Sequence, residues 1–101
     1  MNKKFTLLFT PEAVQQIKQI VLRYNGKSKG LGDKFKTNLK SALNVVKRNP
    51  FAHTVRYDDI RFAIPKKFPY AAHYSIDEQT KTIIIYPVFG FAENPENWVI
   101  K

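Results

Sequence analysis

Cysteine is absent from this chain of 101 residues. Its absence excludes disulfide frameworks, thiolate nucleophiles and cysteine-ligated zinc, and it fits a reducing compartment, so we expect a cytoplasmic protein. Long apolar runs are also lacking. The run from Phe5 to Phe9 is much shorter than the apolar core of a secretory signal, and no stretch approaches the roughly 20 apolar residues that cross a bilayer. The sequence therefore predicts neither a signal peptide nor a membrane span.

Acidic residues are scarce. Eight Asp and Glu stand against 17 Lys and Arg, which gives a formal net charge of +9. Such an excess favours a polyanionic partner, which could be RNA, DNA or a strongly acidic protein segment, although a basic protein without such a partner is the alternative. The length fits one domain over residues 1–101, and 44% hydrophobic residues are enough for a core without disulfides.

Patterns for metals and bound phosphates are missing as well. Asp58 and Asp59 form a carboxylate pair, but neither a histidine nor a further acid stands at metal-ligand spacing from them. The glycines between Gly26 and Gly32 lack the lysine-serine ending of a phosphate-binding loop. We therefore expect no metal, no cofactor and no small-molecule substrate.

The first half of the chain predicts a strand and a helical hairpin. Residues 5–9 alternate in a pattern that predicts a short strand largely buried on both sides. Thr10 and the proline after it begin a helix whose apolar stripe runs over residues 13–24. Residues 25–30 are a polar breaker cluster, and a second apolar stripe over 31–46 predicts an amphipathic helix with lysines on its other faces. These lysines either face solvent or contact nucleic acid.

The second half of the chain changes to a period of two residues. Three strands are predicted in meander order, at Ile60–Ile64, Ala71–Ile76 and Ile83–Tyr86. Pro87 cannot donate to a ladder, so the last strand either bulges there or leaves that side unpaired. The expected order is β-α-α-β-β-β, an α+β fold with a helical hairpin packed on one face of a small, mostly antiparallel sheet.

Three segments in this order resemble the RelE/ParE toxin superfamily of type II toxin-antitoxin systems, which includes plasmid stabilisation proteins. The segments are the hairpin that ends in Asn49-Pro50, the run from Arg61 to Phe68-Pro69-Tyr70, and the tail Asn94-Pro95-Glu96-Asn97-Trp98. The resemblance covers essentially the whole chain and implies a RelE/ParE-like fold. It also implies a toxin that an antitoxin holds inactive by wrapping an acidic, partly disordered segment around it.

Some members of this superfamily cleave mRNA on the ribosome. Such cleavage needs a base for the 2′-hydroxyl, cations for the developing phosphorane charge and an acid for the leaving oxygen. Arg61 matches the arginine that precedes Phe-Pro-Tyr in the family, and Lys66 and Lys67 add positive charge nearby. With Tyr70, or alternatively Tyr74, they are the candidate catalytic residues.

Two positions depart from the nuclease pattern. Gly90 stands where close relatives carry a histidine, and Glu93 stands where they carry an arginine. The first change removes a group that titrates near neutral pH, and the second places negative charge beside a phosphate path. Both changes point away from nuclease chemistry. The two histidines, His53 and His73, lie outside this motif and are interpreted as structural.

Three functions remain open from the sequence. The first is a toxin that acts by binding, in the manner of the ParE-like members that poison DNA gyrase. The second is a ribosome-dependent mRNA endoribonuclease like RelE, and the third is a non-toxic member that retains antitoxin binding alone. Whether the chain is an enzyme is left undecided, and no membrane partner is expected. The candidate contacts for nucleic acid or antitoxin are Arg56, Arg61, Lys66, Lys67 and Trp98, the last of which could instead anchor the tail in the core.

Overall fold

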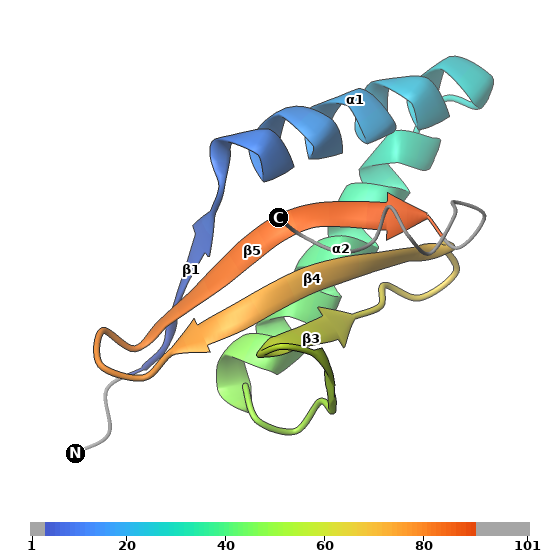
Figure 1. Cartoon of the computed structure of the whole chain (residues 1–101). Coiled ribbons are helices and arrows are strands. Elements are labelled where there is room, and N and C mark those ends of the chain that lie inside the picture. Colours follow the sequence, from blue (N-terminus) through green and yellow to red (C-terminus); the bar gives the residue numbers. More distant parts are fainter. Residues whose placement is uncertain (1–3, 91–101) are drawn as a thin grey trace.

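The computed structural model describes residues 4–90, which form two helices packed on a five-stranded sheet (Figure 1). The strand order is β1-β5-β4-β3-β2, in which β1 is parallel to β5 and the other neighbours are antiparallel. The predicted α+β class and the mostly antiparallel sheet are confirmed. The elements in chain order are β1 (Thr6–Phe9), α1 (Pro11–Lys27), α2 (Leu31–Arg48), β2 (Val55–Tyr57), β3 (Ile60–Ala63), β4 (Tyr70–Asp77) and β5 (Thr82–Gly90).

The sheet has one strand more than the sequence predicted. In β2, Val55 pairs with Arg61 and Tyr57 pairs with Ile60. The turn between β2 and β3 is tight, and Asp58 adopts a φ of 47° there. A strand of three residues is too short to show an alternating pattern, so the sequence does not predict β2 as a separate strand.

Helix α1 begins as expected and ends later than expected. The hydroxyl of Thr10 accepts a hydrogen bond from the amide of Ala13 at 3.1 Å, which is an N-cap. The helix then continues through Gly26 to Lys27, so the predicted break at residue 25 is wrong. An exposed glycine costs a helix only about 1 kcal/mol relative to alanine, which the rest of α1 can carry. Neither α1 nor α2 is long and apolar enough to span a bilayer.

The two helices approach each other closely at Gly32. The amide of Gly32 donates to the side-chain oxygen of Asn25 at 2.7 Å. A Cβ atom at residue 32 would lie 2.1 Å from the carbonyl oxygen of Val21, far inside van der Waals contact. Glycine is therefore required at this crossing, and it fixes how the hairpin closes.

Both helices contribute to one core on one face of the sheet, as predicted. Helix α2 supplies most of the buried helical side chains, and α1 adds Ile20. The strand residues in this core share one face by their register, since Tyr74 pairs with Ile85 and Ala72 pairs with Val88. In Figure 1, α2 crosses behind the sheet while α1 lies beside it along β5. The buried residues of the core are Ile20, Phe35, Leu39, Leu43, Val46, Ala63, Phe68, Ala72, Tyr74, Ile83, Ile85 and Val88.

Strand β1 covers only the first part of the β5 edge, and Gln16 of α1 covers the next part. The β1 ladder ends at Phe9 opposite Ile85. Beyond it, the Gln16 side chain donates to the carbonyl oxygen of Val88 and accepts from the amide of Val88 at 2.7 Å. One side-chain amide thus replaces a strand neighbour. The prediction that residues 5–9 are largely buried on both sides is wrong, because β1 is an edge strand and Leu8 is 57% exposed.

Pro87 lies in a bulge, which was one of the two predicted outcomes. Two steps along β4, from Ala72 to Tyr74, face three steps along β5, from Val88 back to Ile85. The extra residue takes the proline out of the regular ladder. Strand β5 can therefore continue past Pro87 to Gly90.

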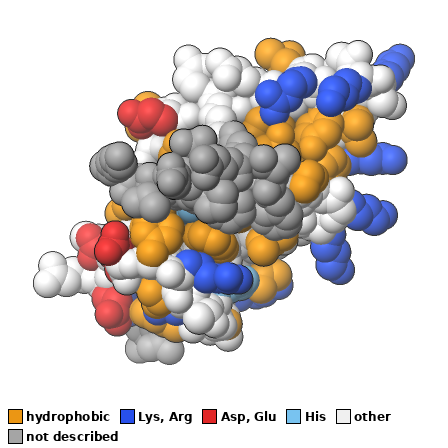
Figure 2. Space-filling view, turned by 45° about the vertical axis from the view of Figure 1, so that its right-hand side comes forward, with side chains coloured by type: hydrophobic (Ala, Val, Ile, Leu, Met, Phe, Trp, Pro, Cys, Tyr) orange, Lys and Arg blue, Asp and Glu red, His pale blue; other side chains and the backbone are white. Residues whose placement is uncertain are grey.

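Charge is unevenly distributed over the molecule. Residues 11–48, which hold both helices, contain nine of the 17 Lys and Arg but two of the eight Asp and Glu. The acidic pairs Asp58-Asp59 and Asp77-Glu78 lie in two turns that the strand register places at the same end of the sheet. Figure 2 shows most of the basic side chains on the right of the view, a smaller basic group low in the centre, and the acidic side chains on the left.

Candidate functional site

The predicted site residues lie along β2, β3 and the start of β4. Arg56 is in β2 and Arg61 is in β3, while Tyr70 is the first residue of β4. Lys66 and Lys67 lie in the connection between β3 and β4. Trp98 and Glu93 lie outside the described residues.

Arg61 is engaged in holding the loop that follows α2. Its Nη1 donates to the carbonyl oxygens of His53 and, at 3.4 Å, of Phe51. Its guanidinium carbon also lies 5.3 Å from the centroid of the Phe51 ring. Three contacts to one loop make Arg61 a structural clamp, which leaves less of its fork free for a phosphate.

Tyr74 completes this clamp from the neighbouring strand. It pairs with Arg61 across β3 and β4, and its hydroxyl donates to the carbonyl oxygen of Pro50 at 3.0 Å. Burial raises the pKa of Tyr74 to about 12, while the positive charge of Arg61 acts in the opposite direction. Tyr74 is therefore a neutral hydrogen-bond donor at physiological pH, not a proton carrier.

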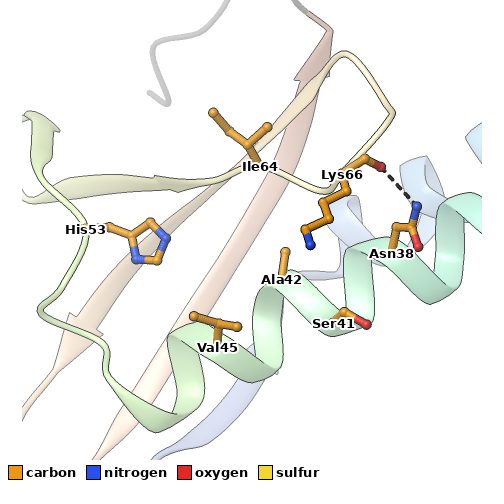
Figure 3. Close-up of a pocket in the computed structure, with 7 residues that line it drawn as sticks. All are labelled: Asn38, Ser41, Ala42, Val45, His53, Ile64 and Lys66. Atoms are coloured by element: carbon orange, nitrogen blue, oxygen red, sulfur yellow. Dashed lines mark hydrogen bonds between the residues drawn. The ribbon is translucent and has the colours of Figure 1, made fainter.

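Lys66 lines a cavity of about 380 Å³ between α2 and the end of β3 (Figure 3). The side chain of Lys66 enters from the β3–β4 connection, and His53 points in from the opposite side. The connection is fixed on α2, because the side-chain amide of Asn38 donates to the carbonyl oxygen of Lys66 at 3.0 Å. The other lining residues are Ser41, Ala42, Val45 and Ile64.

Tyr70 belongs to a different cluster. Its hydroxyl accepts a hydrogen bond from Nη2 of Arg23 at 2.9 Å, and its ring packs edge-on against Phe35 with centroids 5.5 Å apart. It pairs with Gly90, and a Cβ atom at residue 90 would lie 3.4 Å from the Tyr70 ring. The position at which the family resemblance predicts a histidine is thus beside Tyr70, and this chain has a glycine at that position.

The structure does not bring the candidate catalytic residues together. Arg61 lies opposite Tyr74, four residues along β4 from Tyr70, which corresponds to about 13 Å at the usual rise of a strand. Lys67 is exposed, with a φ of 69°, and does not line the cavity that Lys66 enters. The four candidate catalytic residues therefore do not form one site. They are Arg61, Lys66, Lys67 and Tyr70.

The face of the sheet opposite the helices carries an aromatic cluster that the sequence analysis did not identify. The ring of His73 stacks on Phe62 with centroids 4.2 Å apart and lies 4.9 Å from Phe89. The hydroxyl of Tyr57 is 3.0 Å from Nδ1 of His73. Burial lowers the pKa of His73 to about 4, so this histidine is neutral at physiological pH. A neutral, fully buried ring agrees with a structural role.

The sequence predicts only a structural role for His53 and none for the α2 residues that line the Lys66 cavity. Asn38 and Ser41 belong to the polar side of an amphipathic helix, and such residues normally face solvent. His53 lies in a loop, so no periodicity places it. The loop that carries His53 is held beside α2 by the hydrogen bonds of Arg61 and Tyr74. These contacts join residues that are distant in the sequence, so no local pattern predicts them.

Several solved structures share this fold at low sequence identity, whereas no protein-family model and no curated protein matches the chain. The chromosomal ParDE toxin-antitoxin system from P. aeruginosa matches with a TM-score of 0.72 and 15% identity, over 86% of this chain and 96% of that one. The intact E. coli RelBE toxin-antitoxin complex matches with a TM-score of 0.67 and 21% identity, over 91% and 100%.

The isolated E. coli RelE toxin matches with a TM-score of 0.66 and 21% identity, over 95% of this chain and 92% of that one. The similarity therefore spans nearly the whole of both chains, with and without a partner present in the solved structure. At these identities the likeness concerns the arrangement of the backbone. The chain accordingly has the fold of the RelE and ParE toxins.

Proposed function

We propose that this chain is the toxin of a bacterial type II toxin-antitoxin pair, and that it acts in the cytoplasm by binding a macromolecular target. An acidic, partly disordered antitoxin neutralises it. Two observations support this proposal: the RelE/ParE fold, and the concentration of positive charge in the helical hairpin. A disordered acidic segment that folds onto a basic surface gains from electrostatic steering and from apolar burial together.

The observation that favours binding over catalysis is the separation of the candidate catalytic residues. General acid-base chemistry requires its groups within hydrogen-bonding reach of one reacting phosphate. Here the clamp residue Arg61 is bonded to the loop carbonyls, and Tyr70 is bonded to Arg23 farther along the sheet. We therefore favour ParE-like action on DNA gyrase over RelE-like cleavage of mRNA.

The experiment is an induction assay in the absence of antitoxin, with growth, mRNA integrity and DNA supercoiling read from the same culture. We expect growth arrest with altered supercoiling and an SOS response, while mRNA on the ribosome stays intact. Cleavage of ribosomal mRNA with normal supercoiling would instead establish the endoribonuclease alternative. Normal growth under strong induction would establish a non-toxic member that retains antitoxin binding.

A double variant separates binding from catalysis further. In the double variant Lys66→Gln, Lys67→Gln, loss of two cations should reduce toxicity in a graded way if the surface only binds. A nuclease that uses these lysines for transition-state charge would lose activity by about 100-fold or more. Coexpression with an acidic protein from the neighbouring reading frame should restore growth in either case, and failure to do so would count against the toxin-antitoxin assignment.

A further inference from the structure

The helical hairpin leaves a cavity at its open end. The two helices meet at Gly32 and separate from there toward β1 (Figure 1). Between them lies a cavity of about 480 Å³, which we call the hairpin cavity. Strand β1 contributes Leu7 and Phe9 to its lining, α1 contributes Ile17, and α2 forms the remaining wall. The volume of the cavity falls within the range of small-molecule sites, about 300 to 1,000 Å³.

The floor of the hairpin cavity is apolar. Leu7, Phe9 and Ile17 pack against the core, yet all three are only half-buried. Leu39 and Leu43 of α2 line the same cavity and are almost fully buried. Apolar surface that stays in contact with water is unfavourable, so an apolar group in the cavity would gain free energy by covering the half-buried side chains.

The α2 side of the hairpin cavity has a row of positive charges. Lys36, Lys40 and Lys47, which we call the rim lysines, line the cavity and are exposed. Their spacing of four and seven residues places them on one side of α2, over about 16 Å of its length. None of them has an ion-pair partner among residues 4–90. Their apolar stems can extend the floor of the cavity while their ammonium groups stay in water at its mouth.

An apolar floor beside a cationic rim selects the chemical class of the ligand. A single apolar chain that ends in an anion satisfies both parts of the cavity. A nucleotide fits poorly, because bases stack on aromatic planes and Phe9 is the one aromatic ring among the described residues that line the cavity. A helix of a partner protein is about 10 to 12 Å wide with its side chains, which is too wide to enter a cavity of this volume.

We propose that the hairpin cavity binds a fatty acid, with its acyl chain on Leu7, Phe9 and Ile17 and its carboxylate at the rim lysines. The acyl chain displaces water from the apolar floor, and the carboxylate accepts charge-assisted hydrogen bonds at the mouth of the cavity. The bound ligand contacts α1, α2 and β1 together, at the end of the hairpin away from Gly32. This inference goes beyond the proposed function, and the purified chain tests it without antitoxin or target.

The experiment titrates the full-length chain at low salt with hexanoate, octanoate and decanoate, each below the concentration at which it forms micelles. Calorimetry gives the affinities, and methyl NMR reports the location of the ligand. We expect the methyl signals of Leu7 and Ile17 to shift, while those of Val45, which lines the cavity of Figure 3 instead, stay unchanged. Each added methylene should strengthen binding by up to about fourfold until the cavity is full, because that is the gain from burying one methylene.

Two triple variants of equal net charge test the rim. The first replaces all three rim lysines with glutamine and should weaken decanoate binding by about fivefold, the effect of a strong exposed ion pair. The matched control combines Lys27→Gln, Lys29→Gln and Lys34→Gln, three exposed positions that do not line the cavity. It should change the affinity by less than a factor of about two, since distant exposed charges are screened. All six lysines are exposed, so we expect both variants to fold, and circular dichroism checks this.

Four results would overturn the proposal. The first is a titration with decanoate that leaves the signals of Leu7 and Ile17 unchanged, which needs no variant and is independent of folding. The second is an equal loss of affinity in the two triple variants, which would show unspecific attraction to a basic protein. The third is equal affinity for hexanoate and decanoate, because the chain would then not be buried. The fourth is binding of decyltrimethylammonium as tight as that of decanoate, which would remove any role for the rim charges.

Discussion

The close crossing of α1 and α2 gives the sharpest test of the fold, because two glycines in the same hairpin should respond to the same substitution with opposite sign. In Gly32→Ala, the new Cβ atom would lie 2.1 Å from the carbonyl oxygen of Val21 and 2.9 Å from side-chain atoms of Asn25. The first of these is a backbone atom, which cannot move away without displacing the helix. The hydrogen bond from residue 32 to Asn25 would be distorted as well.

The expected loss follows from these contacts. Overpacking of a core costs about 1 to 3 kcal/mol, and a distorted hydrogen bond about 1 kcal/mol. Replacing a glycine in a helix returns at most about 1 kcal/mol. We therefore expect Gly32→Ala to lower the free energy of unfolding by about 2 to 3 kcal/mol, which lowers the melting temperature by about 10 to 20 °C in a domain of this size.

The control is Gly26→Ala, one residue before the end of α1. Nothing lies within 4 Å of a Cβ atom built there, so only the helix propensity changes and the variant should gain up to about 1 kcal/mol. Urea unfolding followed by far-ultraviolet circular dichroism measures both variants against the wild type. Equal stability of Gly32→Ala and Gly26→Ala would refute the close crossing.

Three further predictions concern single side chains. Gln16→Leu should lower the free energy of unfolding in urea by about 2 to 3 kcal/mol, because both hydrogen bonds to β5 are lost. The control Gln15→Leu, on the exposed side of the helix, should change it little. Equal effects of the two substitutions would contradict the role of Gln16 at the edge of β5. The pKa of His73 falls from 6.5 unfolded to about 4 folded, so its contribution is complete above pH 6.5 and is lost as the pH falls toward 4. This shift of the pKa corresponds to at most about 3 kcal/mol of stability. His73→Phe should remove that part of the pH dependence of the unfolding free energy. An unchanged slope of unfolding free energy against pH would argue against a buried neutral ring. Tyr74→Phe should cost about 1 to 2 kcal/mol and raise hydrogen exchange in residues 50–54 selectively, and uniform exchange would show that the loop is held elsewhere.

The parts of the fold that the sequence predicted are those whose signal is local. The apolar stripe of α2, the cap at Thr10 and the bulge at Pro87 each depend on residues within a few positions of one another. Their physical causes are side-chain periodicity, an exposed helix end and a missing amide donor. The end of α1 was missed because Gly26 and Asn25 are common in turns, while Asn25 here gains a distant partner in Gly32.

The site could be predicted much less well, because its geometry is set by contacts between distant residues. The sequence shows Arg61 as a free cation near Lys66, and nothing local reveals that it binds the loop carbonyls after α2. The same clamp brings His53 to face Lys66, although the two are separated by β2 and β3. Composition predicts an anionic partner, but the positions of the groups that would contact it depend on strand register and loop closure.

The segregation of charge along the sheet has a consequence for how the molecule moves toward a partner. With cationic helices and the acidic turns gathered apart, the described part of the chain has a large electric dipole as well as a net charge. In the field of a polyanion such a molecule experiences a torque and turns before it touches, so a greater share of collisions begins with the cationic side foremost. Added salt shortens the range of that torque to about 8 Å at physiological ionic strength, which makes orientation, and not only attraction, sensitive to the medium.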